Sequence, residues 1–90
     1  MQTRVMVYET DYCGYCRKAR SLLEEKGIPF ERQDVTNDPE RRRWLVRATG
    51  QYTVPQIFID GEPVGGYREL KALSQSGELD RRLAQENRPK

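Results

Sequence analysis

The chain has no histidine, and only two of its 90 residues are cysteines. Without histidine a cysteine hydrolase lacks its usual base, and a zinc site lacks the imidazole ligands that often accompany thiolates. Secreted domains held together by disulfides usually carry four or more cysteines at varied spacings. The sequence therefore argues against a cysteine hydrolase and against a secreted domain held together by disulfides.

Long apolar runs are also missing. The opening residues, MQTRVMVYET, lack the seven or more consecutive apolar residues of a signal peptide, and no later run approaches the length of a membrane span. Sixteen lysines and arginines are offset by fourteen aspartates and glutamates, which leaves a net charge of +2 and little attraction for nucleic acid. We expect a cytoplasmic protein with no nucleic-acid or membrane partner.

Apolar residues make up 36% of the chain and charged residues 33%, which is a polar balance for a folded protein. Because the charges nearly cancel and the apolar residues recur periodically, we predict a folded chain rather than a disordered one. Ninety residues suffice for one domain with a small core. We expect it to span residues 1–90, with a frayed tail from about residue 86.

Hydrophobic periodicity and turn residues divide the chain into short elements. We expect strands over residues 4–8, 28–35, 54–59 and 62–64, and helices that begin near residues 13, 39 and 66, with a last helical piece after residue 77. Asp38 before Pro39 is typical of a helix N-terminus. On that second helix we expect Trp44, Leu45 and Ala48 to share one face, with Trp44 as a core anchor.

The elements follow the order β-α-β-α-β-β-α, which predicts an α/β fold. A crossover helix joins the first two strands, so these should run parallel. Asp60-Gly61 is a strong two-residue hairpin turn, so the last two strands should be antiparallel. Pro63 favours the sheet edge for the final strand, and the shared apolar face of Val5 and Val7 favours a central position for the first.

Both cysteines lie in the stretch DYCGYCRKA, between the first strand and the first helix. At a helix N-terminus the free N–H groups and the helix dipole favour a thiolate, and Arg17 and Lys18 add positive charge. The spacing places Cys16 one turn further along on the same side, within reach of Cys13 and partly shielded. We therefore predict that Cys13 is the nucleophile and Cys16 the resolving thiol.

Two other roles for the cysteine pair compete with this interpretation. A zinc site would need at least two further ligands, from carboxylates or from a second subunit. A structural disulfide would close too short a loop to restrict the unfolded chain appreciably. The position of the pair between a strand and a helix favours redox chemistry over both.

Three motifs make the sequence resemble the dithiol glutaredoxins, which have a thioredoxin fold. They are Y-x-x-x-x-C-G-Y-C from Tyr8 to Cys16, TGQYTVPQIFID from Thr49 to Asp60 and GGYREL from Gly65 to Leu70. The resemblance covers roughly residues 5–83 and implies a four-stranded mixed sheet flanked by helices. It also implies a monomeric oxidoreductase that reduces protein–glutathione mixed disulfides and protein disulfides, with glutathione as reductant and glutathione reductase as an indirect partner.

The resemblance also implies which residues bind glutathione. Pro55 would have a cis peptide bond and would place the backbone of Thr53 and Val54 beside the sulfurs, where it pairs with the cysteine backbone of glutathione. Tyr15 would line the groove, and Gln51 would face the glycine carboxylate. The alternatives are a surface aromatic for Tyr15, a solvated loop residue for Gln51 and an ordinary trans bond at Pro55.

At the start of the final helix, the resemblance implies that Gly66 and Tyr67 receive the γ-glutamyl carboxylate, an anion site that helix physics also predicts. Glu69 would pair with the γ-glutamyl amine, and its alternative role is a first-turn acid that interacts with the helix dipole. Arg68 replaces the small or acidic residue usual in the family and would supply charge for the carboxylate.

Two further departures from the family pattern bear on function. Thr10 stands where lysine is common, which weakens the expected stabilisation of the thiolate. Gly14 replaces the usual proline and removes a φ constraint. Some family members without that proline hold a [2Fe-2S] cluster between two subunits, with one active-site cysteine from each and two glutathione thiols. A cluster carrier or redox sensor that uses Cys13 as ligand is therefore the alternative function.

Two remaining features receive less specific interpretations. A redoxin that draws electrons from thioredoxin reductase would carry SGFRP near Gly65, and this sequence does not. The basic cluster on the second expected helix is interpreted as a solvated helix face, although it could also attract anionic glutathione. Its members are Arg41, Arg42, Arg43 and Arg47.

Overall fold

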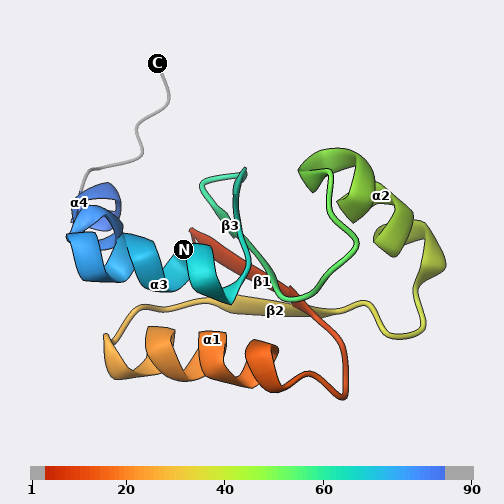
Figure 1. Ribbon diagram of the computed structural model, residues 1–90, viewed down its shortest axis with the longest axis horizontal. Helices are drawn as coiled ribbons and strands as arrows, with labels where there is room; N and C mark the ends of the chain where they lie inside the picture. Colours follow the sequence, from red (N-terminus) through yellow and green to blue (C-terminus); the bar gives the residue numbers. More distant parts are fainter. Residues whose placement is uncertain (1–3, 85–90) are drawn as a thin grey trace.

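The computed structural model describes residues 4–84 of the chain (Figure 1). Its elements are β1 (Val5–Glu9), α1 (Gly14–Glu25), β2 (Glu31–Asp34), α2 (Pro39–Thr49), β3 (Gln56–Ile59), β4 (Glu62–Gly65), α3 (Tyr67–Ser76) and α4 (Glu78–Ala84). The predicted order of elements is confirmed, with α4 as the last helical piece. The tail expected to fray from about residue 86 lies outside the described residues. Within residues 4–84, no helix has both the length and the apolar character needed to cross a membrane.

The four strands form one mixed sheet in the order β2-β1-β3-β4. β1 pairs with β2 in parallel and with β3 antiparallel, and β3 pairs with β4 antiparallel. The central position of β1 and the edge position of β4, the strand that contains Pro63, are confirmed. The expected start of β2 at residue 28 is wrong. The Ile28 N–H donates to the Leu23 carbonyl at 2.9 Å, so residue 28 still closes the end of α1, and pairing with β1 begins at Glu31.

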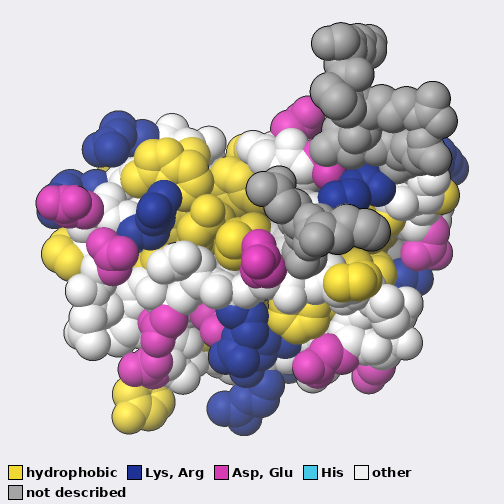
Figure 2. All heavy atoms as spheres, turned by 180° about the vertical axis from the view of Figure 1, so that it is seen from behind, with side chains coloured by type: hydrophobic (Ala, Val, Ile, Leu, Met, Phe, Trp, Pro, Cys, Tyr) yellow, Lys and Arg dark blue, Asp and Glu magenta, His cyan; other side chains and the backbone are white. Residues whose placement is uncertain are grey.

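Helices cover both faces of the sheet, and each face has its own hydrophobic cluster. Side chains from α1, α3 and α4 pack on one face, around the core residues Val5, Val7, Ala19, Leu23, Ile57, Ile59, Leu70 and Leu79. α2 packs on the other face through a smaller cluster whose buried members are Val35, Leu45 and Phe58. Figure 1 shows α2 standing apart from the other helices. Seen from behind, hydrophobic side chains reach the surface in the region of α2 (Figure 2).

α2 contacts the sheet through a narrow face centred on Leu45, which is 3% exposed. Trp44 is half-buried and stacks on Phe58 with ring centroids 5.6 Å apart, consistent with its expected role as a core anchor. The expectation that Ala48 shares this face is wrong, because Ala48 is exposed. The basic cluster is largely solvated as predicted, except that Arg42 is half-buried.

Asp38 caps the N-terminus of α2, as the sequence predicted. Its Oδ1 accepts the N–H of Arg41 at 3.0 Å, and Pro39 begins the helix. We expect Asp38→Ala to lower the free energy of unfolding by about 1 kcal/mol, because one N–H of the first turn loses its partner. Asp38→Asn keeps an acceptor and should retain most of the stability. Urea unfolding at equilibrium measures both, and equal losses in the two variants would contradict the capping role.

Candidate active site

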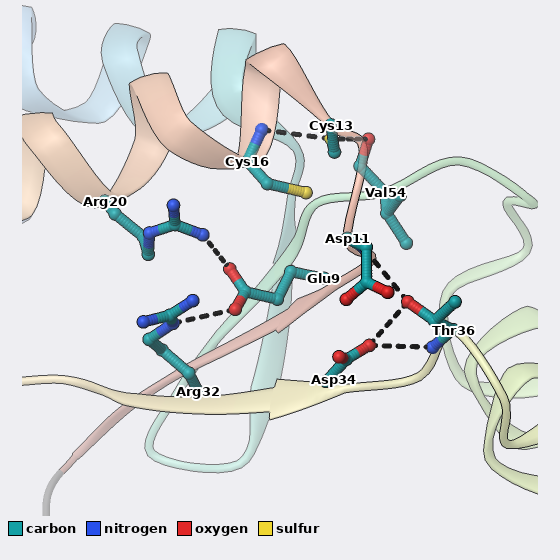
Figure 3. A network of polar contacts seen from close by, with 9 residues as sticks. All are labelled: Glu9, Asp11, Cys13, Cys16, Arg20, Arg32, Asp34, Thr36 and Val54. Atoms are coloured by element: carbon teal, nitrogen blue, oxygen red, sulfur yellow. Dashed lines mark hydrogen bonds and ion pairs between the residues drawn. The ribbon is translucent and has the colours of Figure 1, made fainter.

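Cys13 is the N-cap residue of α1, at the end of the loop that follows β1. Its Sγ accepts the N–H of Cys16 at 3.1 Å, and its thiol donates to the carbonyl oxygen of Val54, 41 residues further along the chain, at 3.5 Å (Figure 3). The side chain is partly exposed, and neither cysteine is in a disulfide. A backbone N–H aimed at sulfur at a helix N-terminus is the arrangement that stabilises a thiolate.

Cys16 lies one turn further into α1 and is fully buried, at 0% exposure. Burial, followed by hydrogen bonding with Cys13, raises the pKa of Cys16 to about 12. Cys16 therefore remains a protonated thiol at neutral pH. The two cysteines differ sharply in access, and only Cys13 can meet a substrate directly.

The segment before β3 faces the two cysteines. The Val54–Pro55 peptide bond is cis, as the family resemblance implied, and Pro55 is buried. Gly66 approaches this segment so closely that a Cβ at Gly66 would lie 3.2 Å from the Pro55 carbonyl oxygen. The structure thus brings the starts of α1 and α3 to the same segment.

Aromatic rings join the first turns of α1 and α3. The ring centroids of Tyr15 and Tyr67 are 6.0 Å apart, and the Lys18 ammonium lies 5.2 Å from the Tyr15 centroid. Tyr15 is 52% exposed, whereas Tyr67 is half-buried and packs against the larger core cluster. The pair therefore presents an accessible aromatic surface supported from the core side.

The polar residues expected at the start of α3 lie at the surface. Glu69 is exposed, and its Oε1 accepts the N–H of Gly66 at 2.7 Å, which is the contact of a first-turn acid with its own helix end. Arg68 is also exposed, and its guanidinium forms no hydrogen bond or ion pair with a described residue. Glu69 is thus already engaged within the chain, whereas the Arg68 guanidinium is available to a ligand.

Gln51 and Thr53 are exposed in the loop between α2 and β3. Both accept hydrogen bonds from the side chain of Gln56, a fully buried residue that was not among the predicted site residues. The signal that could have identified Gln56 is its polar side chain inside the apolar strand sequence VPQIFI. Such a residue requires a hydrogen-bond partner in the fold.

Glu9 was also missed. Its carboxylate is buried at the end of β1, where it pairs with Arg20 of α1 and with Arg32 of β2, whose Nε lies 2.7 Å from Oε2 (Figure 3). Both oxygens have a guanidinium partner, which is what allows a carboxylate to be buried. The strand alternation that placed Val5 and Val7 on one face also places Glu9 there. The three charges tie the active-site helix to two strands.

A second polar cluster holds the loop in front of Cys13. The Asp11 N–H donates to Thr36 Oγ1 at 2.9 Å, and Thr36 donates to Asp34 through its N–H at 2.9 Å and its hydroxyl at 2.6 Å. Hydrogen bonding with Asp34 raises the pKa of Asp11, and hydrogen bonds from Thr36 lower the pKa of Asp34. The end of β2 thereby anchors the loop that leads to Cys13.

Comparison with known proteins points to one family. The sequence model of the glutaredoxin family matches residues 5–64. The chain is 42% identical over 80 residues to a glutaredoxin of Pseudomonas aeruginosa, which covers 89% of this chain and 95% of the relative. It is 38% identical over 76 residues to glutaredoxin 3 of Escherichia coli K12, which covers 84% of this chain and 92% of the relative.

Solved structures agree with the sequence relatives. A buckwheat glutaredoxin–glutathione complex superposes with a TM-score of 0.85 at 27% identity, covering 90% of this chain and 76% of the other. A glutaredoxin from Brucella melitensis superposes with a TM-score of 0.79 at 39% identity, covering 88% and 86%. The α/β fold with a four-stranded mixed sheet is therefore that of the glutaredoxins.

The difference in burial between the thiols predicts selective alkylation. Iodoacetamide added to the reduced protein at pH 7 should modify Cys13 alone, since Cys16 is enclosed and its pKa is raised to about 12. A free cysteine has a pKa of about 8.5 and is therefore mostly ionised at pH 9. Cys16 in the folded protein should remain protonated and unmodified at that pH. Peptide mass spectrometry locates the adducts, and labelling in urea serves as the control. Equal labelling of both cysteines in the folded protein would contradict this assignment.

Proposed function

This chain belongs to the glutaredoxin family and is a thiol–disulfide oxidoreductase that works with glutathione, and we propose that Cys13 is its nucleophile and Cys16 its resolving thiol. One observation carries the proposal. A partly exposed thiol at a helix N-terminus receives a backbone N–H, while its neighbour one turn away is buried. The first thiol is arranged to attack, and the second to act only on a bond that Cys13 has already formed.

With a protein–glutathione mixed disulfide, the Cys13 thiolate attacks the glutathione sulfur. The protein thiolate leaves, and Cys13 becomes glutathionylated. A second glutathione thiolate then attacks the glutathione sulfur on Cys13, which releases oxidised glutathione and restores the Cys13 thiolate. The raised pKa of Cys16 suits this route, because a buried protonated thiol competes poorly with the incoming glutathione.

With a protein disulfide, Cys13 forms a mixed disulfide with one substrate sulfur and releases the other as a thiolate. Cys16 then loses its proton and attacks Cys13, which releases the second substrate thiolate and leaves a Cys13–Cys16 disulfide. Two glutathione molecules reduce that disulfide and are themselves oxidised. The proton transfer from buried Cys16 makes this the more demanding route.

For glutathione binding we propose the residues that surround the exposed face of Cys13. The backbone of Thr53 and Val54 would pair with the cysteine of glutathione, with Pro55 behind it, and Tyr15 would cover one side. Gln51 is exposed where it could meet a carboxylate.

The first turn of α3 would receive the other end of glutathione. The N–H groups at its start suit the γ-glutamyl carboxylate, with Gly66 and Tyr67 at the helix end and Arg68 as an added charge. Glu69 would meet the γ-glutamyl amine through Oε2, because its Oε1 accepts the N–H of Gly66.

The roles of the two thiols predict different losses in two variants. Cys16→Ser should retain removal of glutathione from a glutathionylated peptide and lose the reduction of a protein disulfide that needs both thiols. Cys13→Ser should lose both activities. A glutathione-coupled assay on each substrate measures this, with a thioredoxin-reductase-coupled assay as control. Loss of both activities in Cys16→Ser would show that the nucleophile is assigned wrongly.

A bridging [2Fe-2S] cluster is the second candidate. Only Cys13 offers an accessible thiol, and the described residues contain no group of three or more side chains suited to a metal. Each chain would therefore supply one cluster ligand, Cys13. A dimer and two glutathione thiols would be needed to provide all four ligands. When bound, the cluster would supply electron-transfer or cluster-donation chemistry.

Gly14 offers a test of the cluster. It is the first residue of α1, and a Cβ there would meet no atom within 4 Å, so proline fits this position. After anaerobic reconstitution with iron, sulfide and glutathione, we expect visible absorption and a dimer in the parent protein, and less of both in Gly14→Pro. A colourless parent protein would exclude the cluster, and full assembly in Gly14→Pro would show that Gly14 does not control it.

Other properties stay predictions from the family and the sequence. We expect glutathionylated or disulfide-containing proteins as substrates, glutathione reductase as the enzyme that recycles oxidised glutathione, a cytoplasmic location and a monomeric enzyme in the absence of a cluster.

A further inference from the structure

The segment from Gln51 to Val54 has no regular secondary structure, yet other elements hold each of its residues. The Gln51 N–H donates to Thr49 Oγ1 at 3.1 Å, and Arg42 Nη2 donates to the Tyr52 carbonyl at 3.1 Å. Gln56 holds Thr53, and Cys13 holds Val54. These side chains, rather than the hydrogen bonds of a strand ladder, set the shape of the segment. It is the same segment that is proposed to pair with glutathione.

Gln56 is the only one of these supports that is a fully buried side-chain amide. Its Nε2 donates to Thr53 O at 2.9 Å and to Gln51 Oε1 at 3.0 Å, with a longer contact to Thr53 Oγ1 at 3.4 Å. Because an amide nitrogen donates and an amide oxygen accepts, these three acceptors fix the orientation of the Gln56 side-chain amide. The other end, Oε1, is buried without a hydrogen-bond partner among the described residues.

An amide in this position does not favour folding. A buried carbonyl without a partner destabilises the folded state, and an apolar side chain of the same shape would avoid that cost. The acceptors on Gln51 and Thr53 belong to exposed residues, so water could replace Gln56 as their donor. The benefit of the amide therefore lies in where it places the loop rather than in stability.

We propose that Gln56 is a positioning residue for glutathione, which acts by holding Gln51 and the Thr53 backbone in their binding geometry. The inference rests on the proposed glutathione site. Gln56 itself does not touch the ligand, because it is fully enclosed. Its role would appear in the affinity for glutathione-containing substrates and not in the rate of sulfur exchange.

Gln56→Met tests this inference. Methionine has nearly the same shape, removes the donor and also removes the unpartnered oxygen. We expect KM for a glutathionylated peptide and for reduced glutathione to rise about three- to tenfold, with kcat nearly unchanged and with a melting temperature equal to or above that of the parent. Gln56→Leu provides a second variant with the same expected KM change.

Ile59→Val is the matched control. Ile59 is buried in β3 three residues beyond Gln56, and it belongs to the larger core cluster rather than to the one against which Val54 packs. The variant should lower the melting temperature and leave both KM values unchanged. An unchanged KM in Gln56→Met, or a rise of KM in Ile59→Val as large as that in Gln56→Met, would overturn the positioning role.

The same assays separate this inference from the proposed function. If the parent protein had no glutathione-dependent activity, the proposed function would fail before any variant was measured. If the parent were active and Gln56→Met had the parent's KM, only the positioning role would be lost.

Discussion

The active site depends on one topological constraint. The loops that follow β1, β2 and β4 and the loop that precedes β3 all lie at the same end of the sheet. β1 runs antiparallel to β3, and β3 runs antiparallel to β4, so β1 and β4 end where β3 begins. Cys13 follows β1, Gly66 follows β4, and Pro55 precedes β3, so all three lie at that end of the sheet. β2, parallel to β1, ends there too and brings Thr36 to the loop before Cys13.

Burial then gives two chemically identical side chains different environments. Cys13 lies at the helix tip, where backbone N–H groups face outward, and Cys16 lies one turn deeper against the core. Desolvation disfavours the charged form of a thiol, so the deeper sulfur keeps its proton while the outer one is available to substrates. A dithiol enzyme can thus favour exchange with glutathione over internal resolution without any change in the motif.

Buried polar groups stabilise the parts of the site that lack regular structure. Glu9 and Gln56 are the two polar side chains in the described chain that are almost fully enclosed. Glu9 links β1, α1 and β2 through paired charges, and Gln56 links β3 to the loop that precedes it. Such groups stabilise folding less than apolar ones would, but their bonds are directional and specify one arrangement.

The sequence by itself determined the order of elements, the hairpin, the cap at Asp38, and the placement of Cys13 at a helix start, because these follow from local periodicity and turn chemistry. Family resemblance added the cis bond at Pro55. Only the tertiary structure decided that pairing of β2 begins at Glu31, that Ala48 faces solvent, and that Glu9 and Gln56 support the site. Those outcomes depend on how the elements pack against one another, which no local sequence pattern predicts.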